Sequence, residues 1–133
     1  ADEIATGFGR TGRMFAFEHA DVDPDIVCVG KALSAGALPI SATIVKDAIY
    51  DTFADRPADR PFYHGHTFCG NPIAAAAALA ALRVYEGLDI AARARAIEDA
   101  ARAALQPLAD LPHVREVRCL GGIAAVEFKA ATG

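Results

Sequence analysis

The hydrophobic and polar positions along the chain predict short strands and longer helices. Apolar runs rich in β-branched residues predict strands at 26–29, 40–45, 114–120 and 123–128, the last two joined by a glycine turn. The first run is uninterrupted, so we expect it to be buried on both faces, as in a parallel sheet. Apolar residues at helical spacing predict helices at about 47–53, 72–86 and 89–108. The mixture predicts an α/β fold.

Capping signals define the helix 72–86. Asn71 is a good N-cap, Pro72 a good first helical residue and Gly87 a plausible stop. We expect a domain boundary near 87–89, with an α/β part before it and a helix-plus-hairpin unit after it.

The helix 89–108 is predicted to be amphipathic. Glu98 and Arg102 form an i,i+4 pair that we place opposite the apolar face. That face consists of Ile90, Ile97, Ala101, Leu105 and Leu108.

A single lysine follows the strand 26–29. Gly30 ends this strand, and Lys31 comes next. Ligands of open α/β sheets gather at the carboxyl ends of strands, where a desolvated lysine is a nucleophile able to form a Schiff base. The alternative is a solvated lysine just past a strand.

Residues 7–12 fit the pattern G-x-G-x-x-G. A dinucleotide site needs a hydrophobic strand before this pattern and a helix opening within it, and neither is predicted here. A glycine-hinged loop that closes on another part of the chain is the preferred interpretation. Gly30 and Lys31 also fail as a phosphate loop, because Ala32 stands at the Ser/Thr position.

The segment 62–72 carries several polar groups before a helix start. His64 and His66 have metal-ligand spacing but no neighbouring cysteine or carboxylate, so loop histidines are preferred over a metal site. Thr67 is a candidate anion donor or a local turn former.

Composition narrows the class of protein. The 133 residues are 53% hydrophobic with a net charge of −4, and no basic patch points to nucleic acid. No apolar stretch is long enough for a membrane span. Cys28, Cys69 and Cys119 are expected to be small buried thiols of a reducing cytoplasm. The two ends favour an internal piece of a longer chain.

Several blocks occur together in a recognisable order. They are D-E-I-A-T-G-F-G-R-T-G at 2–12, E-H-A at 18–20, G-K-A-L at 30–33, T-F at 67–68 and G-N-P at 70–72. In this order they resemble the class III aminotransferases, which depend on pyridoxal phosphate (PLP). The resemblance implies the fold-type I PLP-dependent transferase architecture. Residues 1–87 would be the second half of the PLP-binding large domain, and 88–133 a linker helix with the start of the small C-terminal domain.

The resemblance also implies roles for single residues. Lys31 matches the lysine that binds PLP and substrate and moves the proton, and Asp2 matches the partner of the pyridine nitrogen. Thr67 matches the residue that binds the PLP phosphate from the neighbouring subunit of a homodimer, with His66 beside it in the cofactor-binding set. Arg10 would meet a substrate carboxylate; a structural ion pair is the alternative.

Within the family, 2–12 with 18–20 is most similar to the branch that acts in biotin biosynthesis. That branch transfers an amino group from S-adenosylmethionine to 8-amino-7-oxononanoate. His66 stands where many of its members have proline, so lysine is the alternative donor. Two further interpretations stay open: a class III aminotransferase acting on an ω-amino acid, ornithine or lysine, and a non-catalytic fragment. The implied partners are small molecules, with no nucleic acid and no membrane.

Overall fold

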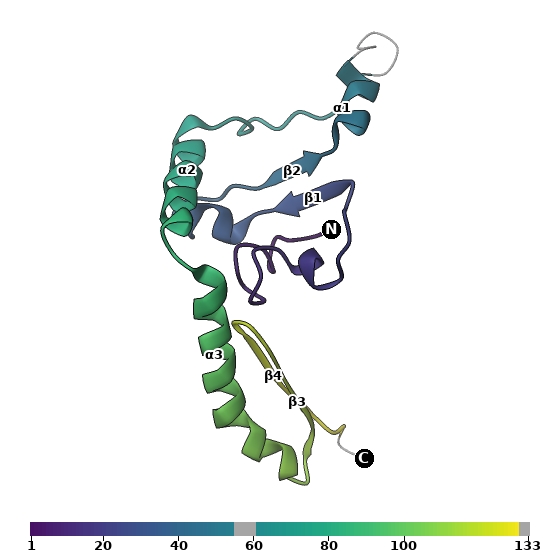
Figure 1. Ribbon diagram of the computed structural model, residues 1–133. Coiled ribbons are helices and arrows are strands. Elements are labelled where there is room, and N and C mark those ends of the chain that lie inside the picture. The colour runs from purple at the N-terminus through teal and green to yellow at the C-terminus, as the bar shows by residue number, and fades with distance from the viewer. Residues whose placement is uncertain (55–60, 131–133) are drawn as a thin grey trace.

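The computed structural model describes residues 1–54 and 61–130, and its elements follow the predicted order closely. The elements are η1 (Ala16–His19), β1 (Ile26–Val29), η2 (Lys31–Ser34), β2 (Ala42–Val45), α1 (Asp47–Ala54), α2 (Pro72–Glu86), α3 (Ile90–Leu105), η3 (Gln106–Asp110), β3 (Val114–Leu120) and β4 (Ile123–Phe128). Figure 1 shows β1 and β2 beside α2, and α3 running along the β3–β4 hairpin. The loop-rich N-terminal segment lies between these two parts.

The environment of β1 differs from the prediction. In the described chain β1 pairs antiparallel with β2, and its one parallel neighbour is a single bridge from Asp2 to Cys28. Ile26 is 43% exposed, and Val29 alone in the strand is fully buried. The expectation of a strand buried on both faces in a parallel sheet is therefore wrong for these residues, because so few described segments cover it.

A small core lies directly beneath the turn that follows β1. Val29, Leu33 and Ala78 form it, and the partly buried Phe8 and Phe15 pack against it. Leu33 is one turn beyond Gly30, whose carbonyl accepts a 2.9 Å hydrogen bond from the Leu33 N–H. The buried alanine of α2 lets the helix approach η2 closely, so packing fixes the backbone around Lys31.

The helix α2 begins and ends where the sequence predicts. The Asn71 side chain accepts hydrogen bonds from the N–H groups of Ile73 at 3.0 Å and Ala74 at 3.3 Å. The last helical residue is Glu86, and Gly87 follows in a right-handed conformation with φ −82°. The following helix α3 is shorter than predicted, because Pro107 belongs to the separate 3-10 helix η3.

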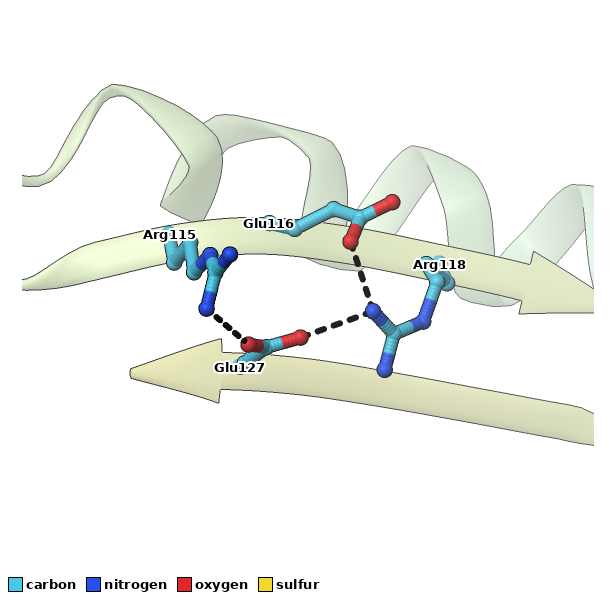
Figure 2. Close-up of polar contacts among 4 residues, drawn as sticks. All are labelled: Arg115, Glu116, Arg118 and Glu127. Carbon is cyan, nitrogen blue, oxygen red and sulfur yellow. Dashed lines mark hydrogen bonds and ion pairs between the residues drawn. The ribbon is translucent and has the colours of Figure 1, made fainter. Parts of the chain in front are cut away.

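The β3–β4 hairpin has its predicted bounds and a two-residue turn, with Leu120 paired to Ile123. Four charged residues of the hairpin form the network in Figure 2. Glu127 accepts hydrogen bonds from Arg115 at 3.0 Å and Arg118 at 2.8 Å, and Arg118 also donates to Glu116 at 2.6 Å. The guanidinium of Arg118, followed by that of Arg115, holds the pKa of Glu127 below its ordinary value.

The three cysteines are free, but they are not all buried as predicted. Cys28 and Cys119 are half-buried, whereas Cys69 is exposed in the turn 67–70 that precedes α2. Among the described helices, none combines the length and the apolar character needed to cross a membrane.

Candidate active site

Lys31 occupies a strained backbone position at the carboxyl end of β1. Its φ of 42° is left-handed, which residues with a side chain rarely adopt. The neighbouring structure holds it there, since the Tyr85 hydroxyl of α2 donates a 2.7 Å hydrogen bond to the Ala32 carbonyl. Strained residues that are fixed by their surroundings cluster at functional sites, so the geometry makes Lys31 a functional candidate.

Asp2 lies on the segment that runs parallel to β1. The Glu3 N–H donates to the Cys28 carbonyl at 2.8 Å, and the Cys28 N–H donates to the Ala1 carbonyl at 2.9 Å. Because the two segments run in the same direction, Asp2 lies level with a point on β1 only three residues before Lys31. The Ile4 N–H donates to Asp2 Oδ1 at 3.0 Å and orients the exposed carboxylate.

Lys31 also lines a hollow of about 270 Å³ between the N-terminal loop, η2 and α3. Phe8, Tyr85 and aliphatic side chains of α3 supply apolar surface. The charged residues in its lining are Arg10, Lys31 and Arg93, all of them cations. A hollow with this charge attracts anions such as carboxylates and phosphates.

The glycine-rich segment 7–12 forms turns that close on α3 and on the hairpin, as the sequence predicts. Gly9, at φ 88°, is so close to Ile90 that a Cβ would overlap that side chain. Gly12, at φ 87°, accepts a 3.1 Å hydrogen bond from Arg95 through its carbonyl. With no strand immediately before the turns, the arrangement is not that of a dinucleotide-binding loop.

Arg10 projects from this loop. The ion pairs of the described residues do not include it, so the alternative of a structural ion pair finds no support there. Its guanidinium lies against Gly122, where an added Cβ would be 3.4 Å from Arg10 Nη1.

Thr67 and His66 are not brought together with the other candidates. Both are exposed in the segment before α2, and the Phe68 N–H donates to His66 Nδ1 at 3.3 Å. Lys31 lies beside the last turn of α2, because Tyr85 of that turn donates a hydrogen bond to the carbonyl of the next residue, Ala32. Since 15 helical residues span about 22 Å, Thr67 and Lys31 lie near opposite ends of α2.

Two residues that line the hollow beside Lys31 were not singled out from the sequence, Tyr85 and Arg93. The predicted i,i+4 pair of Glu98 with Arg102 is confirmed, but the placement of Glu98 opposite the apolar face of α3 is wrong. Its carboxylate accepts a 2.6 Å hydrogen bond from the Gly121 N–H as well as a 2.7 Å bond from Arg102. At 100° per residue, Glu98 lies about 80° around the helix from Ile90, on the flank that faces the hairpin. Nothing in the local sequence distinguishes Tyr85 or Arg93.

A second hollow, of about 540 Å³, lies between the glycine loop, η1 and α3. Arg13, His19 and Arg95 line it together with Glu18 and Glu98, so its charges are mixed. The His19 Nε2 atom is 3.0 Å from the Thr11 hydroxyl. None of the residues proposed from the sequence for the site line this hollow. Within the described ranges, no cluster of three or more His, Cys, Asp or Glu side chains is arranged to hold a metal ion.

Comparison with solved structures supports the predicted fold class. An (S)-enantioselective omega-transaminase from Thermomicrobium roseum matches with a TM-score of 0.89 and 38% identity, over 96% of this chain and 28% of that one. The ornithine aminotransferase from Toxoplasma gondii matches with a TM-score of 0.83 and 40% identity, over 96% and 29% respectively. The chain thus has the α/β fold of the matching part of these fold-type I transaminases.

Comparison with protein sequences covers the whole chain. The adenosylmethionine-8-amino-7-oxononanoate aminotransferase of Synechococcus elongatus is 44% identical over 133 residues, which is 100% of this chain and 31% of that protein. An omega-aminotransferase of Caulobacter vibrioides is 42% identical over 134 residues, or 99% and 30%. The chain therefore spans less than a third of the length of these relatives. The family model for aminotransferase class III matches residues 1–133, and the chain belongs to the class III aminotransferase family.

Proposed function

We propose that this chain is part of a PLP-dependent aminotransferase that transfers an amino group from S-adenosylmethionine to 8-amino-7-oxononanoate, in biotin biosynthesis. The observation that carries the proposal is the position of Lys31, strained at the end of β1 and near Asp2 on the adjacent parallel segment. The proposed substrates follow the relative from Synechococcus elongatus, whose name gives this reaction.

The functional groups of the described residues near Lys31 fit PLP. Lys31 supplies an amine for the aldehyde carbon of PLP, and Asp2 supplies a carboxylate for its ring nitrogen. The cationic lining of the hollow beside Lys31 suits an anionic cofactor and substrate. The Toxoplasma gondii relative is described with PLP at its active site, which supports the same cofactor here.

The chain's own residues divide the chemistry between them. When bound, PLP takes up the electron pair left by the breaking C–H bond of the substrate. The Lys31 amine, once released, accepts the proton from that substrate carbon and returns it as a general acid. The Asp2 carboxylate would favour the protonated pyridine nitrogen by pairing with its positive charge. Arg10 pairs with a substrate carboxylate from the wall of the hollow.

A homodimer with shared active sites accounts for the position of Thr67. Thr67 and His66 precede α2, whereas Lys31 lies beside its last turn. Their exposure leaves them available to a neighbouring copy, where the Thr67 hydroxyl would bind the PLP phosphate. In this arrangement residues 1–87 belong to the large domain and 88–133 begin the small domain. The free thiols of Cys28, Cys69 and Cys119 suit a cytoplasmic location.

The test is a single-turnover assay of the full-length, PLP-loaded enzyme. Each donor is added alone, the conversion of the cofactor is followed by absorbance, and 8-amino-7-oxononanoate is then added. Rapid conversion with S-adenosylmethionine supports the proposal, and conversion with lysine alone identifies lysine as the donor. Conversion with ornithine or β-alanine, and none with S-adenosylmethionine or lysine, assigns the enzyme to another branch of the class III family.

A further inference from the structure

The glycine loop that carries Arg10 is fixed largely from the C-terminal part of the chain. Ile90 packs against Gly9, Arg95 donates to the Gly12 carbonyl, and the Gly122 N–H donates to the Arg10 carbonyl at 2.7 Å. Each of these contacts joins residues about 80 or more positions apart in the sequence. The position of Arg10 therefore depends on where α3 and the hairpin turn are held.

The Gly121–Gly122 turn packs tightly against the backbone of the glycine loop. A Cβ at Gly121 would lie 2.5 Å from the Arg10 carbonyl oxygen and from the Gly12 nitrogen. This glycine also has a left-handed φ of 55°. Because the contact is backbone on backbone, a shift of the turn is transmitted directly to the peptide of Arg10.

Glu98 holds the turn from the other side. One oxygen of its carboxylate accepts from the Gly121 N–H at 2.6 Å, and the other accepts from Arg102 at 2.7 Å. Arg102 in turn donates to the Cys119 carbonyl at 3.1 Å, so the pair is bonded to two backbone groups where β3 enters the turn. The Gly121 N–H, followed by Arg102, holds the pKa of Glu98 below its ordinary value, which keeps the carboxylate charged.

We propose that Glu98 is a positioning residue that acts through the Gly121–Gly122 turn to set Arg10 for binding of the substrate carboxylate. The inference rests on the proposed function for the role of Arg10. It adds a residue of α3 that lies outside the hollow beside Lys31 and acts through the loop backbone. A substrate with a carboxylate is bound less well when Glu98 is lost, although the groups that carry out the proton transfer are untouched.

The kinetic test uses the full-length, PLP-loaded enzyme with Glu98→Ala, Arg10→Ala and both changes together. Either single change is expected to raise KM for 8-amino-7-oxononanoate about tenfold with little change in kcat, since a charge-assisted contact is lost. The double variant is expected to match Arg10→Ala, because Glu98 acts through it. Multiplied effects in the double variant, or an unchanged KM for either single variant, would overturn the inference.

The second readout does not depend on activity. Hydrogen exchange of the peptides covering 7–14 and 119–124 in the cofactor-free protein is expected to rise about tenfold with Glu98→Ala. Glu127→Ala is the matched control, because Glu127 also binds arginines of this hairpin, Arg115 and Arg118 (Figure 2), and it should change neither exchange nor KM. Unchanged exchange with Glu98→Ala overturns the positioning role.

A second variant covers the case in which Glu98→Ala does not fold, and the exchange experiment covers the case in which the proposed function fails. Glu98→Gln keeps the size of the side chain and serves if Glu98→Ala does not fold; it should show a smaller rise in both KM and exchange, and no rise counts against the inference. If the unaltered enzyme does not aminate 8-amino-7-oxononanoate, the proposed function fails. The exchange experiment alone then decides whether Glu98 holds the loop.

Discussion

The Glu3 carboxylate accepts a 2.9 Å hydrogen bond from the Phe17 N–H and so joins two segments that are 14 residues apart. Its other oxygen accepts from the Thr6 hydroxyl at 2.5 Å. Glu3 is only 2% exposed, and a buried carboxylate is tolerated only with such partners. Because Glu3 follows Asp2 directly, this buried contact also fixes the segment on which Asp2 lies.

Glu3→Ala should therefore destabilise the protein strongly. Removing the carboxylate leaves the N–H of Phe17 and the hydroxyl of Thr6 without their acceptor, at a cost of about 3 kcal/mol in the free energy of unfolding. Urea unfolding of the full-length protein measures it. Glu116→Ala is the control, because the Glu116 side chain is 51% exposed and should cost less than about 1 kcal/mol. Equal losses would show that burial of Glu3 has no special role.

Substitution of the two turn glycines should have unequal effects. Gly121→Ala places a Cβ against loop backbone and forces alanine into a left-handed φ of 55°, so we expect a loss of about 3 kcal/mol in unfolding free energy. At Gly122 the added Cβ would meet the Arg10 side chain at 3.4 Å, which a flexible side chain can accommodate. Gly122→Ala should thus cost under about 1 kcal/mol. Similar melting temperatures for the two variants would contradict the tight turn–loop contact.

Stability should depend on pH through Glu98. Its folded-state pKa is lowered by the Gly121 N–H first and by Arg102 second, and His19 of η1 acts in the same direction. A lowered carboxyl pKa contributes stability above the unfolded value of about 4.3, and that contribution is lost as pH falls through the folded value. Glu98→Gln should flatten the decline of stability below about pH 4.3. Parallel curves of unfolding free energy against pH for the two proteins would rule out this contribution.

Local signals in the sequence were enough to predict most of the helices and strands. Asn71 and Pro72 start a helix because a side-chain acceptor and a preset φ satisfy the first turn, and this depends on no distant residue. The glycine pair 121–122 defined the hairpin in the same way. The pairing of β1 is not local, since it depends on which segments lie beside it: in the described chain its ladder with β2 is antiparallel, and its parallel contact is a single bridge to Asp2.

The site was predictable only in part, because some of its contacts join residues that are far apart in the sequence. Lys31 was visible from its place after a strand, and Asp2, Arg10, Thr67 and His66 from the family resemblance. The contact between Glu98 and Gly121 joins residues 23 apart, so no window of sequence contains it. At 100° per residue Glu98 lies on the flank of the apolar face of α3 and not opposite it, but only the fold shows that this flank faces the hairpin.

Replacement of the proposed cofactor-binding lysine should abolish activity. We expect Lys31→Ala in the full-length enzyme to lose the cofactor absorbance that borohydride can trap, together with transamination, because the amine supplies both the covalent attachment and the proton transfer. Lys46→Ala is the control, since Lys46 bonds Asp23 and Asp25 on the surface and should retain both properties. A Lys31→Ala enzyme with a reducible cofactor adduct and normal turnover would refute the assignment.

The charge of Asp2 should be needed for the chemistry more than for binding of the cofactor. Asp2→Asn keeps an oxygen that can accept from the Ile4 N–H, so the local backbone should be preserved. It removes the negative charge that keeps the pyridine nitrogen protonated, and we expect the half-reaction with the amino donor to slow at least about a hundredfold while PLP still binds. Single-turnover absorbance measures the rate, and equilibrium dialysis measures PLP binding. Asp23→Asn, a change of the same kind at an exposed surface aspartate, should leave the rate intact. If the Asp2→Asn enzyme reacts at nearly the normal rate, Asp2 has only a structural role, and the anionic partner of the ring must be sought elsewhere in the full-length protein.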